Sequence, residues 1–479
     1  MHLIARGRKG AQRALIGAAL AVVLAGGCSG GSGREPAAAG LELREGAADV
    51  VRVPGDDALI APNPGGVGRT LTATGSIDTT SLFYRSIGAN GRACVSCHVA
   101  SQGWTVTPAG VRERFERTQG LDPIFRANDG SSSPLADLGS LAARRRAFSM
   151  LLTKGLIRVG IGIPDGAEFE LAAVDDPYGF ASARELSLFR RPLPSANLAF
   201  LSTVMWDGRE TLAGMSIRQD LAHQANGATQ GHAQRVDPID DAQREEIVAF
   251  ESGIFFAQAL DFDAGLLTLG GASGGVLELS RTAFHLGIND ALGADPAGQP
   301  FDPASMTLYA AWSGSGGSRL ADARAAVARG EDLFNHKPID ITGVRGLNDA
   351  LGVPAIRGTC TTCHDTPNVG DHSLALPLDI GLADASRRTP DLPLYTLRNK
   401  ATGELFQTTD PGKALITGKW KDLDRFKGPI LRGLAARAPY FHNGAAATLS
   451  DVVGFYDTRF AIGFSAGEKA DLIAFLRTL

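Results

Sequence analysis

Two five-residue stretches decide how this chain folds: Cys94-Val95-Ser96-Cys97-His98 and Cys360-Thr361-Thr362-Cys363-His364. Both read C-x-x-C-H, the attachment signature of c-type haem. The two thiols of such a motif form thioethers with the haem vinyl groups, and the adjoining histidine is the proximal iron ligand. A zinc site or a redox C-x-x-C pair is the alternative, but a zinc ribbon needs a second cysteine pair nearby, which neither motif has. The sequence therefore predicts two covalently bound haem c groups.

An N-terminal export segment precedes the first motif. Arg6, Arg8, Lys9 and Arg13 lead into the apolar run 14–25, which is too short to span a membrane but is typical of a signal peptide. We expect residues 1–27 to be this signal peptide.

The fifth cysteine of the chain, Cys28, stands directly after this segment, where residues 24–28 resemble a bacterial lipobox with one extra small residue. A Gly/Ser tether follows, as a membrane-anchored end requires. We therefore expect Cys28 to be lipidated, with ordinary cleavage nearby as the alternative. Because Ser29 is not an Asp retention signal, the predicted location is the periplasm, as an outer-membrane lipoprotein.

The bulk composition excludes some partners. A chain of 479 residues with 44% hydrophobic residues can form two or three domains with real cores. Its formal net charge of −4 gives no basic field for nucleic acid. No segment after residue 28 approaches a membrane span, so the membrane is expected as a partner only through the lipid anchor.

A weak internal repeat organises the rest of the chain. Leu82-Phe83 precedes the first motif as Leu333-Phe334 precedes the second, and residues 246–250 are echoed by residues 471–475. The later echo is predicted to be an amphipathic helix that begins with a capping box, Ser465-x-x-Glu468. Each repeat would then start with a helix leading to a motif and close with a helix, the plan of a class I cytochrome c domain.

The predicted fold class is therefore mainly α, with two class I cytochrome c-like domains, each carrying one covalent haem, and a Gly-rich irregular insertion. The expected boundaries are a flexible tether at 28–70, an N-terminal domain at 71–260, the insertion at 261–320 and a C-terminal domain at 321–479. Within the insertion, the alternation of residues 275–280 suggests an irregular segment or a hairpin.

Further stretches resemble the bacterial di-haem cytochrome c peroxidases and their MauG-like relatives. They are Trp206-Asp207-Gly208-Arg209, the segment 438–444 that reads Ala-Pro-Tyr-Phe-His-Asn-Gly, Thr448-Leu449 and the terminal helix. The resemblance runs from about residue 75 to 479 apart from the insertion. It implies that the N-terminal haem is catalytic, that the C-terminal haem receives or stores electrons, and that a Trp lies between them. Trp206 matches this Trp, and a core aromatic is the alternative role.

The positions of the methionines limit which residues can be the sixth ligand of the second iron. None of the five methionines follows the second motif, so a downstream Met ligand is excluded. The resemblance places the ligand fourteen residues past His442, at Tyr456, as in MauG-like enzymes, where an anionic oxygen stabilises oxidised iron. His372 and His442 remain alternative ligands, and a packing role for Tyr456 remains open.

At the first iron the resemblance implies an open distal position. Family members that need reductive activation block this position with a loop His about sixteen residues after the motif, where this chain has Arg114. The family's distal Gln corresponds to Gln224, but its distal Glu position is Gln234. Because an amide cannot transfer a proton at neutral pH, the proton is expected to be relayed by His232 or by a water held by Gln224 and Gln234. The alternative is that His223 and His232 are solvent-facing loop residues.

The resemblance also implies calcium between the haems, held by one Asn side chain and two backbone carbonyls. The carbonyls would come from Arg437 and Pro439, but Pro192 stands at the Asn position. Calcium is therefore an expectation with an incomplete ligand set.

Together these observations predict an exported peroxidase or MauG-like oxidoreductase. Hydrogen peroxide or a small oxidant would react at the N-terminal haem, and a small redox protein, a cytochrome c or a cupredoxin, would donate electrons through the C-terminal haem. Two alternatives remain: a di-haem electron carrier without substrate chemistry, and a dioxygenase resembling the rubber-cleaving di-haem enzymes.

Overall fold

The computed structural model describes residues 59–72, 74–314 and 316–479. The expected signal peptide, Cys28 and most of the expected tether lie outside these residues. No helix in the described ranges is long and apolar enough to cross a membrane.

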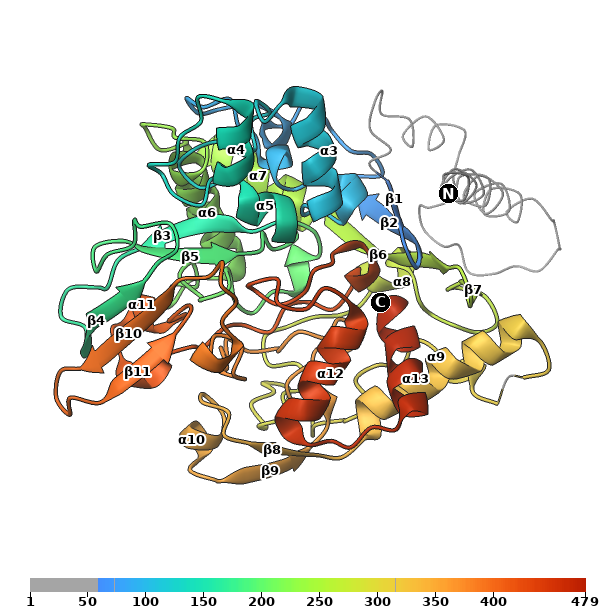
Figure 1. The fold of residues 1–479 in the computed structure, drawn as a ribbon. Coiled ribbons are helices and arrows are strands. Elements are labelled where there is room, and N and C mark those ends of the chain that lie inside the picture. Colours follow the sequence, from blue (N-terminus) through green and yellow to red (C-terminus); the bar gives the residue numbers. More distant parts are fainter. Residues whose placement is uncertain (1–58, 73, 315) are drawn as a thin grey trace, which may run out of the picture. The chain divides into compact units, whose positions relative to one another are not determined.

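Helices and short strands alternate along the described chain (Figure 1). The helices are α3 (Pro108–Thr118), α4 (Leu141–Ala147), α5 (Ser149–Lys154), α6 (Ile217–Gly231), α7 (Asp241–Ser252), α8 (Val276–Ser280), α9 (Arg319–His336), α10 (Asn348–Leu351), α11 (Ala414–Thr417), α12 (Leu449–Phe460) and α13 (Ala466–Arg477). The strands are β1 (Ile60–Asn63), β2 (Gly66–Thr72), β3 (Ile157–Ile161), β4 (Phe169–Asp175), β5 (Leu186–Arg190), β6 (Ile254–Asp261), β7 (Gly265–Leu266), β8 (Ile339–Thr342), β9 (Ala355–Gly358), β10 (Leu394–Asn399) and β11 (Leu405–Thr408).

The strands form small antiparallel sheets, so the mainly α expectation holds only in part. Their orders are β1-β2-β6-β7, β11-β10-β4, β3-β5 and β8-β9. Strand β6 begins Ile254-Phe255-Phe256, and such β-branched and aromatic residues favour a pleated, half-buried surface. The expectation missed these strands because it extended the helical plan of a cytochrome c domain over the whole chain.

One sheet joins segments that are distant in sequence. Strand β10 pairs with β4 in a register that sets Leu394 opposite Asp175 and Asn399 opposite Phe169. Tyr395 and Leu397 on β10 are fully buried in the same apolar cluster as Phe169. The predicted N-terminal and C-terminal domains therefore share a sheet, and their boundaries stay a prediction.

The closing helix has the local structure that its sequence predicted. Ser465 Oγ accepts a hydrogen bond from the Glu468 N–H (3.2 Å), and Glu468 Oε2 accepts one from the Ser465 N–H (2.8 Å), which is the capping box. Helix α13 packs against α9 (Figure 1), and Gly330 on α9 permits the close approach. A Cβ at Gly330 would lie 2.0 Å from the carbonyl oxygen of Asp471.

The repeat is visible in aromatic packing around the two motif histidines. In each copy a Phe that precedes the motif lies near the motif His and near a Phe of the closing helix. The ring centroids are 6.3 Å apart for Phe83–His98, 4.8 Å for Phe83–Phe250, 5.9 Å for Phe334–His364 and 5.6 Å for Phe334–Phe475.

Two local expectations are wrong. Leu82–Tyr84 is a single 3-10 turn rather than an α-helix, because polar residues before it bond locally, as when Asp78 Oδ1 accepts from the Thr80 N–H (2.8 Å). The alternating residues 275–280 form helix α8 rather than a hairpin. Val276 and Leu279, one helical turn apart, are both buried there.

Candidate functional site

The residues of each C-x-x-C-H motif line a separate cavity. The first cavity, of about 190 Å³, contains most of the residues expected at the catalytic haem. Those that line it are Cys94, Cys97, His98, Trp206, Gln224 and His232. Helix α6 supplies Gln224 and ends at His232, which is its C-cap.

His98 has the orientation and protonation state that an iron ligand needs. Its Nδ1 lies 3.2 Å from the carbonyl oxygen of Trp104, so Nδ1–H donates to that oxygen and Nε2 is left for a metal. Burial lowers the pKa of His98 to about 4, which keeps the ring neutral. Trp104 is itself fixed, because its indole N–H donates to Thr70 Oγ1 at 2.9 Å.

His232 is held by a buried carboxylate. Its Nδ1 pairs with Asp129, which also pairs with Arg92. Burial alone would raise the pKa of Asp129, but the hydrogen bonds and charges of His232 and Arg92 outweigh it, and this pKa ends below its ordinary value. The His232 side chain stays 38% exposed and lines the first cavity.

Three other residues expected near the first iron lie outside the first cavity. Gln234 is exposed just after α6 and does not line the cavity. His223 is exposed and pairs with Glu210, with Nδ1 2.6 Å from the carboxylate. Arg114 lies on α3 and donates to the carbonyl oxygen of Ser96 at 2.6 Å.

The second cavity, of about 220 Å³, contains the second motif and all three candidate sixth ligands. The expected residues that line it are Cys360, Cys363, His364, His372, His442, Tyr456 and Trp206. His364 Nδ1 lies 2.6 Å from the carbonyl oxygen of Gly370, so His364 repeats the orientation of His98.

Tyr456 lies on α12 among three phenylalanine rings. The nearest is Phe455, with ring centroids 5.3 Å apart. Burial, with a smaller contribution from the two motif thiols, raises the pKa of Tyr456. Among the described residues, none forms a hydrogen bond with the Tyr456 hydroxyl group. Tyr456 therefore brings to the second cavity a phenol oxygen without a hydrogen-bond partner in the described ranges.

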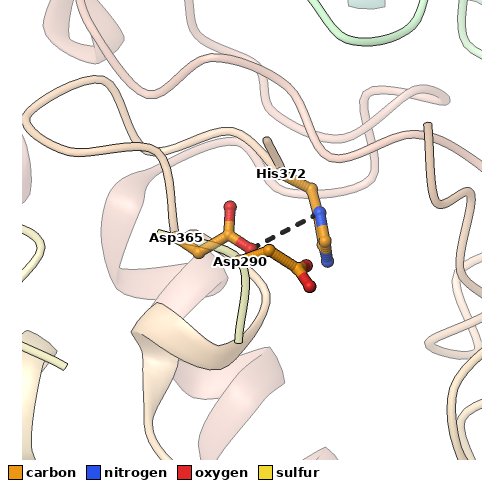
Figure 2. Close-up of side chains that lie close together, drawn as sticks. All are labelled: Asp290, Asp365 and His372. Carbon is orange, nitrogen blue, oxygen red and sulfur yellow. Dashed lines mark ion pairs between the residues drawn. The ribbon is translucent and has the colours of Figure 1, made fainter. Parts of the chain in front are cut away.

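The two alternative histidines have different surroundings. His442 stacks on Phe426 with centroids 3.9 Å apart, and both of its ring nitrogens are buried without a hydrogen-bond partner among the described residues. His372 accepts a hydrogen bond at Nδ1 from the Leu374 N–H (3.2 Å). Figure 2 shows the His372 ring beside Asp365 and Asp290, with an ion pair between His372 and Asp365.

Trp206 lies in the wall that both cavities share. Its backbone carbonyl accepts from the Lys427 N–H at 2.8 Å. The next residue, Asp207, is fully buried and pairs with Arg190, whose Nε also donates to Asp410 at 2.7 Å. This buried network anchors the turn that positions Trp206.

Three buried cations occupy the same shared wall: Arg191, Lys427 and Arg437. They donate mainly to backbone carbonyls, such as those of Gly155 (3.1 Å), Thr203 (3.1 Å) and Ile430 (2.7 Å). Burial lowers the pKa of Arg191 to about 9, of Lys427 to about 8 and of Arg437 to about 10. In the described part of the chain none of the three lies within ion-pair distance of a carboxylate.

The carbonyl expected to bind calcium already has a cationic partner. The oxygen of Arg437 accepts a hydrogen bond from Nη2 of Arg191 at 3.2 Å. Pro439 lines the second cavity, but Pro192 offers no side-chain oxygen. Calcium stays a prediction, and it would compete with the Arg191 guanidinium for this oxygen.

Sequence reasoning missed Glu251 and the cations Arg191 and Lys427, and it named Arg437 only for its backbone carbonyl. Glu251 is buried in the first cavity, and burial raises its pKa to about 8. A signal existed, because Glu251 follows the buried Ile247 by four residues on α7 and so shares its apolar face. The cations lie in irregular loops, where no sequence period predicts burial.

No family model matches the chain. The cytochrome-c peroxidase IdrP2 of Denitromonas iodatirespirans is 32% identical over 133 residues, which cover 26% of this chain and 36% of that protein. The cytochrome-c peroxidase IdrP1 of Pseudomonas sp. (strain SCT) is 32% identical over 140 residues, 25% of this chain and 36% of that protein. The chain thus spans little more than a third of these relatives.

A solved structure, described as a MauG-like protein associated with microbial copper homeostasis, has 18% identity and a TM-score of 0.37, and covers 83% of this chain and 85% of its own. The curated relatives confirm the resemblance to cytochrome c peroxidases that the sequence motifs indicated.

Proposed function

We propose that the protein is a di-haem c-type oxidoreductase of the peroxidase or MauG-like kind. His98 and His364 would each hold one haem, which would supply the peroxide and electron-transfer chemistry, and Trp206 would lie between the two sites. The observation that carries this proposal is the shared wall: each motif lines a separate cavity, and Trp206 lines both.

The motif residues fit covalent haem. Both cysteines of each motif face the same cavity as the motif His, and each His donates through Nδ1 to a carbonyl, which leaves Nε2 for iron. Bound haem supplies the iron at which the peroxide O–O bond breaks and oxidising equivalents are held.

The shared wall also fits haem chemistry. Buried cations without ion-pair partners are costly. Arg191, Lys427 and Arg437 form no ion pair with a described carboxylate, although the nearby Asp371 acts on Lys427 through its charge. Haem propionates are the anions that would balance them, and a guanidinium recognises carboxylates well. We assign these three residues to propionate binding.

His232 is the residue that would move the proton. Its Nδ1 is engaged by Asp129, so Nε2 is the atom that takes a proton from one peroxide oxygen and returns it to the other. Gln224 lines the same cavity and would orient peroxide by hydrogen bonding. The exposed Gln234 has no role in this account.

Tyr456 is the sixth ligand that the geometry favours for the second iron. A ligating atom must be accessible from the cavity. Both ring nitrogens of His442 are instead buried, and the ring stacks on Phe426. The raised pKa of Tyr456 means that only a strong cation in the cavity would deprotonate its hydroxyl. Ferric iron is such a cation, and phenolate ligation of haem occurs in catalases.

For the electron donor and the cellular location of the protein, we keep the expectations from the sequence. A small redox protein, a cytochrome c or a cupredoxin, would deliver electrons to the second haem. The periplasm is the proposed location, with Cys28 as the lipid attachment point.

Peroxide-dependent oxidation of a reduced cytochrome c tests this function. The haem-loaded protein should catalyse the reaction, and a Cys94→Ala/Cys97→Ala variant that retains only the second haem should not. If both proteins oxidise the donor equally slowly while the second haem still cycles between redox states, the chain is an electron carrier.

A further inference from the structure

We propose that Asp290, Asp365 and His372 bind one divalent transition-metal ion of the zinc class, at a site separate from the two iron positions. The site joins the segment expected as an insertion to the loop that directly follows the second motif. Nothing in the proposed peroxidase function requires it.

The three side chains converge from two distant segments (Figure 2). Each offers one ligand atom, and these atoms lie within 4.8 Å of one another. All three residues are buried, with exposures of 1%, 0% and 4% for Asp290, Asp365 and His372.

One distance in the cluster matches metal coordination better than hydrogen bonding. His372 Nδ1 and Asp365 Oδ2 are 3.5 Å apart, beyond an ordinary hydrogen bond. In a tetrahedral zinc site with bonds of about 2.0–2.2 Å, neighbouring ligand atoms lie roughly 3.3–3.6 Å apart. Nδ1 also accepts the long 3.2 Å hydrogen bond from the Leu374 N–H, which a metal bond would replace.

Asp290 supplies independent support for a ligand. Its Oδ1 is buried and has no hydrogen-bond partner among the described residues. Its Oδ2 accepts from the N–H groups of Leu292 (3.1 Å) and Ala294 (2.8 Å), so the carboxylate is fixed in place. Asp365 is fixed likewise, since its Oδ1 accepts from the Ser373 N–H at 2.7 Å. Such outer hydrogen bonds orient ligands for a metal.

The charge of the cluster favours a cation. In the described ranges neither Asp290 nor Asp365 has a Lys or Arg within ion-pair distance, and two buried carboxylates without a cation are costly. A divalent ion neutralises both. Imidazole nitrogen suits zinc, copper, iron and nickel, whereas magnesium and calcium prefer oxygen ligands alone. One nitrogen and two carboxylate oxygens therefore select the zinc class.

Metal binding would restrain the loop that follows His364, the expected proximal ligand of the second haem iron. Asp365 is the residue directly after His364, and His372 lies near the end of the same loop. Asp290 lies on the segment expected as an insertion, so the ion would tie that segment to the loop and stabilise the folded state by mass action.

Equilibrium dialysis of the haem-loaded protein tests the site. After chelator treatment, the wild type should bind one equivalent of Zn²⁺ tightly, measured by elemental analysis beside the haem iron, and its thermal midpoint should rise. Asp290→Asn should weaken the affinity at least about tenfold, since even losing an outer partner has that effect. Asparagine can keep the bonds to Leu292 and Ala294, so the fold should survive.

Asp302→Asn is the matched control, an exposed carboxylate on the same segment that caps Ala304 (2.9 Å). It should bind Zn²⁺ like the wild type. The proposal is overturned if the wild type binds no more Zn²⁺ than Asp290→Asn, or if Mg²⁺ at equal concentration displaces the ion. Because haem iron is counted in the same samples, a failed zinc site is distinguished from failed haem attachment.

Discussion

The indole N–H of Trp206 donates a 2.8 Å hydrogen bond to the backbone carbonyl oxygen of Arg191. This bond fixes the indole in the wall between the two cavities, beside the His442 ring at a centroid distance of 6.3 Å. A fixed aromatic ring in the shared wall is the physical basis for proposing electron exchange between two haems.

Replacing Trp206 should uncouple the haems without removing them. Trp206→Phe loses one hydrogen bond, worth about 1 kcal/mol, and the indole that carries the oxidising equivalent. Stopped-flow spectra after peroxide addition should show the first haem oxidised while the second no longer responds. Trp420→Phe is the control, because Trp420 packs with Phe169 and Phe406 outside both cavities. Equal behaviour of the two variants would contradict the bridging role.

The proton-transfer role of His232 can be separated from that of a surface histidine. His232→Gln should slow the reaction with peroxide by about 10²-fold or more, the usual contribution of a general acid–base group. His223→Gln, which changes an exposed ring outside the cavity, should leave the rate unchanged. Pseudo-first-order rates of peroxide reaction measure both. A normal rate for His232→Gln would assign proton transfer to another group, such as Glu251.

Two helical glycines, one in the contact between α9 and α13 and one on an open face of α12, should respond oppositely to substitution by alanine. Gly330→Ala should destabilise the protein by about 1–3 kcal/mol, because its Cβ would lie 2.0 Å from the Asp471 carbonyl oxygen. Gly454→Ala on α12 meets nothing within 4 Å and should stabilise it by up to about 1 kcal/mol. Urea unfolding followed by circular dichroism measures both changes. A neutral Gly330→Ala would show that the helices are not in close contact.

His442 predicts a loss of stability at acid pH. Burial lowers its pKa to about 4 from the ordinary 6.5, so below pH 6.5 the unfolded chain takes up a proton that the folded protein does not. This residue should therefore cost about 2 kcal/mol of unfolding free energy between pH 7 and pH 5. His442→Phe, which keeps a ring on Phe426, should flatten that part of the pH dependence in urea unfolding. An unchanged slope would mean that His442 is charged when folded.

Local sequence signals predicted local structure well. The motif residues, the capping box of Ser465 and Glu468, and the face of α13 depend on neighbours within a few residues, so the sequence contains them directly. The pairing of Leu394 with Asp175 depends on segments far apart in the chain, and no local pattern encodes it.

The candidate site likewise contains residues that local sequence places and residues that only long-range contacts place. Gln224 and His232 lie on and at the end of one helix, so placing one places the other. Gln234 lies beyond the end of that helix, where the backbone changes direction, and its own φ is 56°. The ten-residue spacing from Gln224 therefore does not bring Gln234 to the cavity. The places of Arg191 and Lys427 could not be predicted from sequence, because loops from both halves of the chain form the wall in which they lie.

The most direct test of the central claim is electron paramagnetic resonance of the oxidised, haem-loaded protein and its Tyr456→His variant. We expect one five-coordinate or water-ligated ferric haem on His98 and one haem ligated by His364 and Tyr456. In the variant both haems should remain attached, the signal of the second should change to that of a bis-histidine haem, and its potential should rise because the phenolate charge is gone. Two doubly protein-ligated low-spin haems in the wild type, or an unchanged signal in Tyr456→His, would contradict the claim.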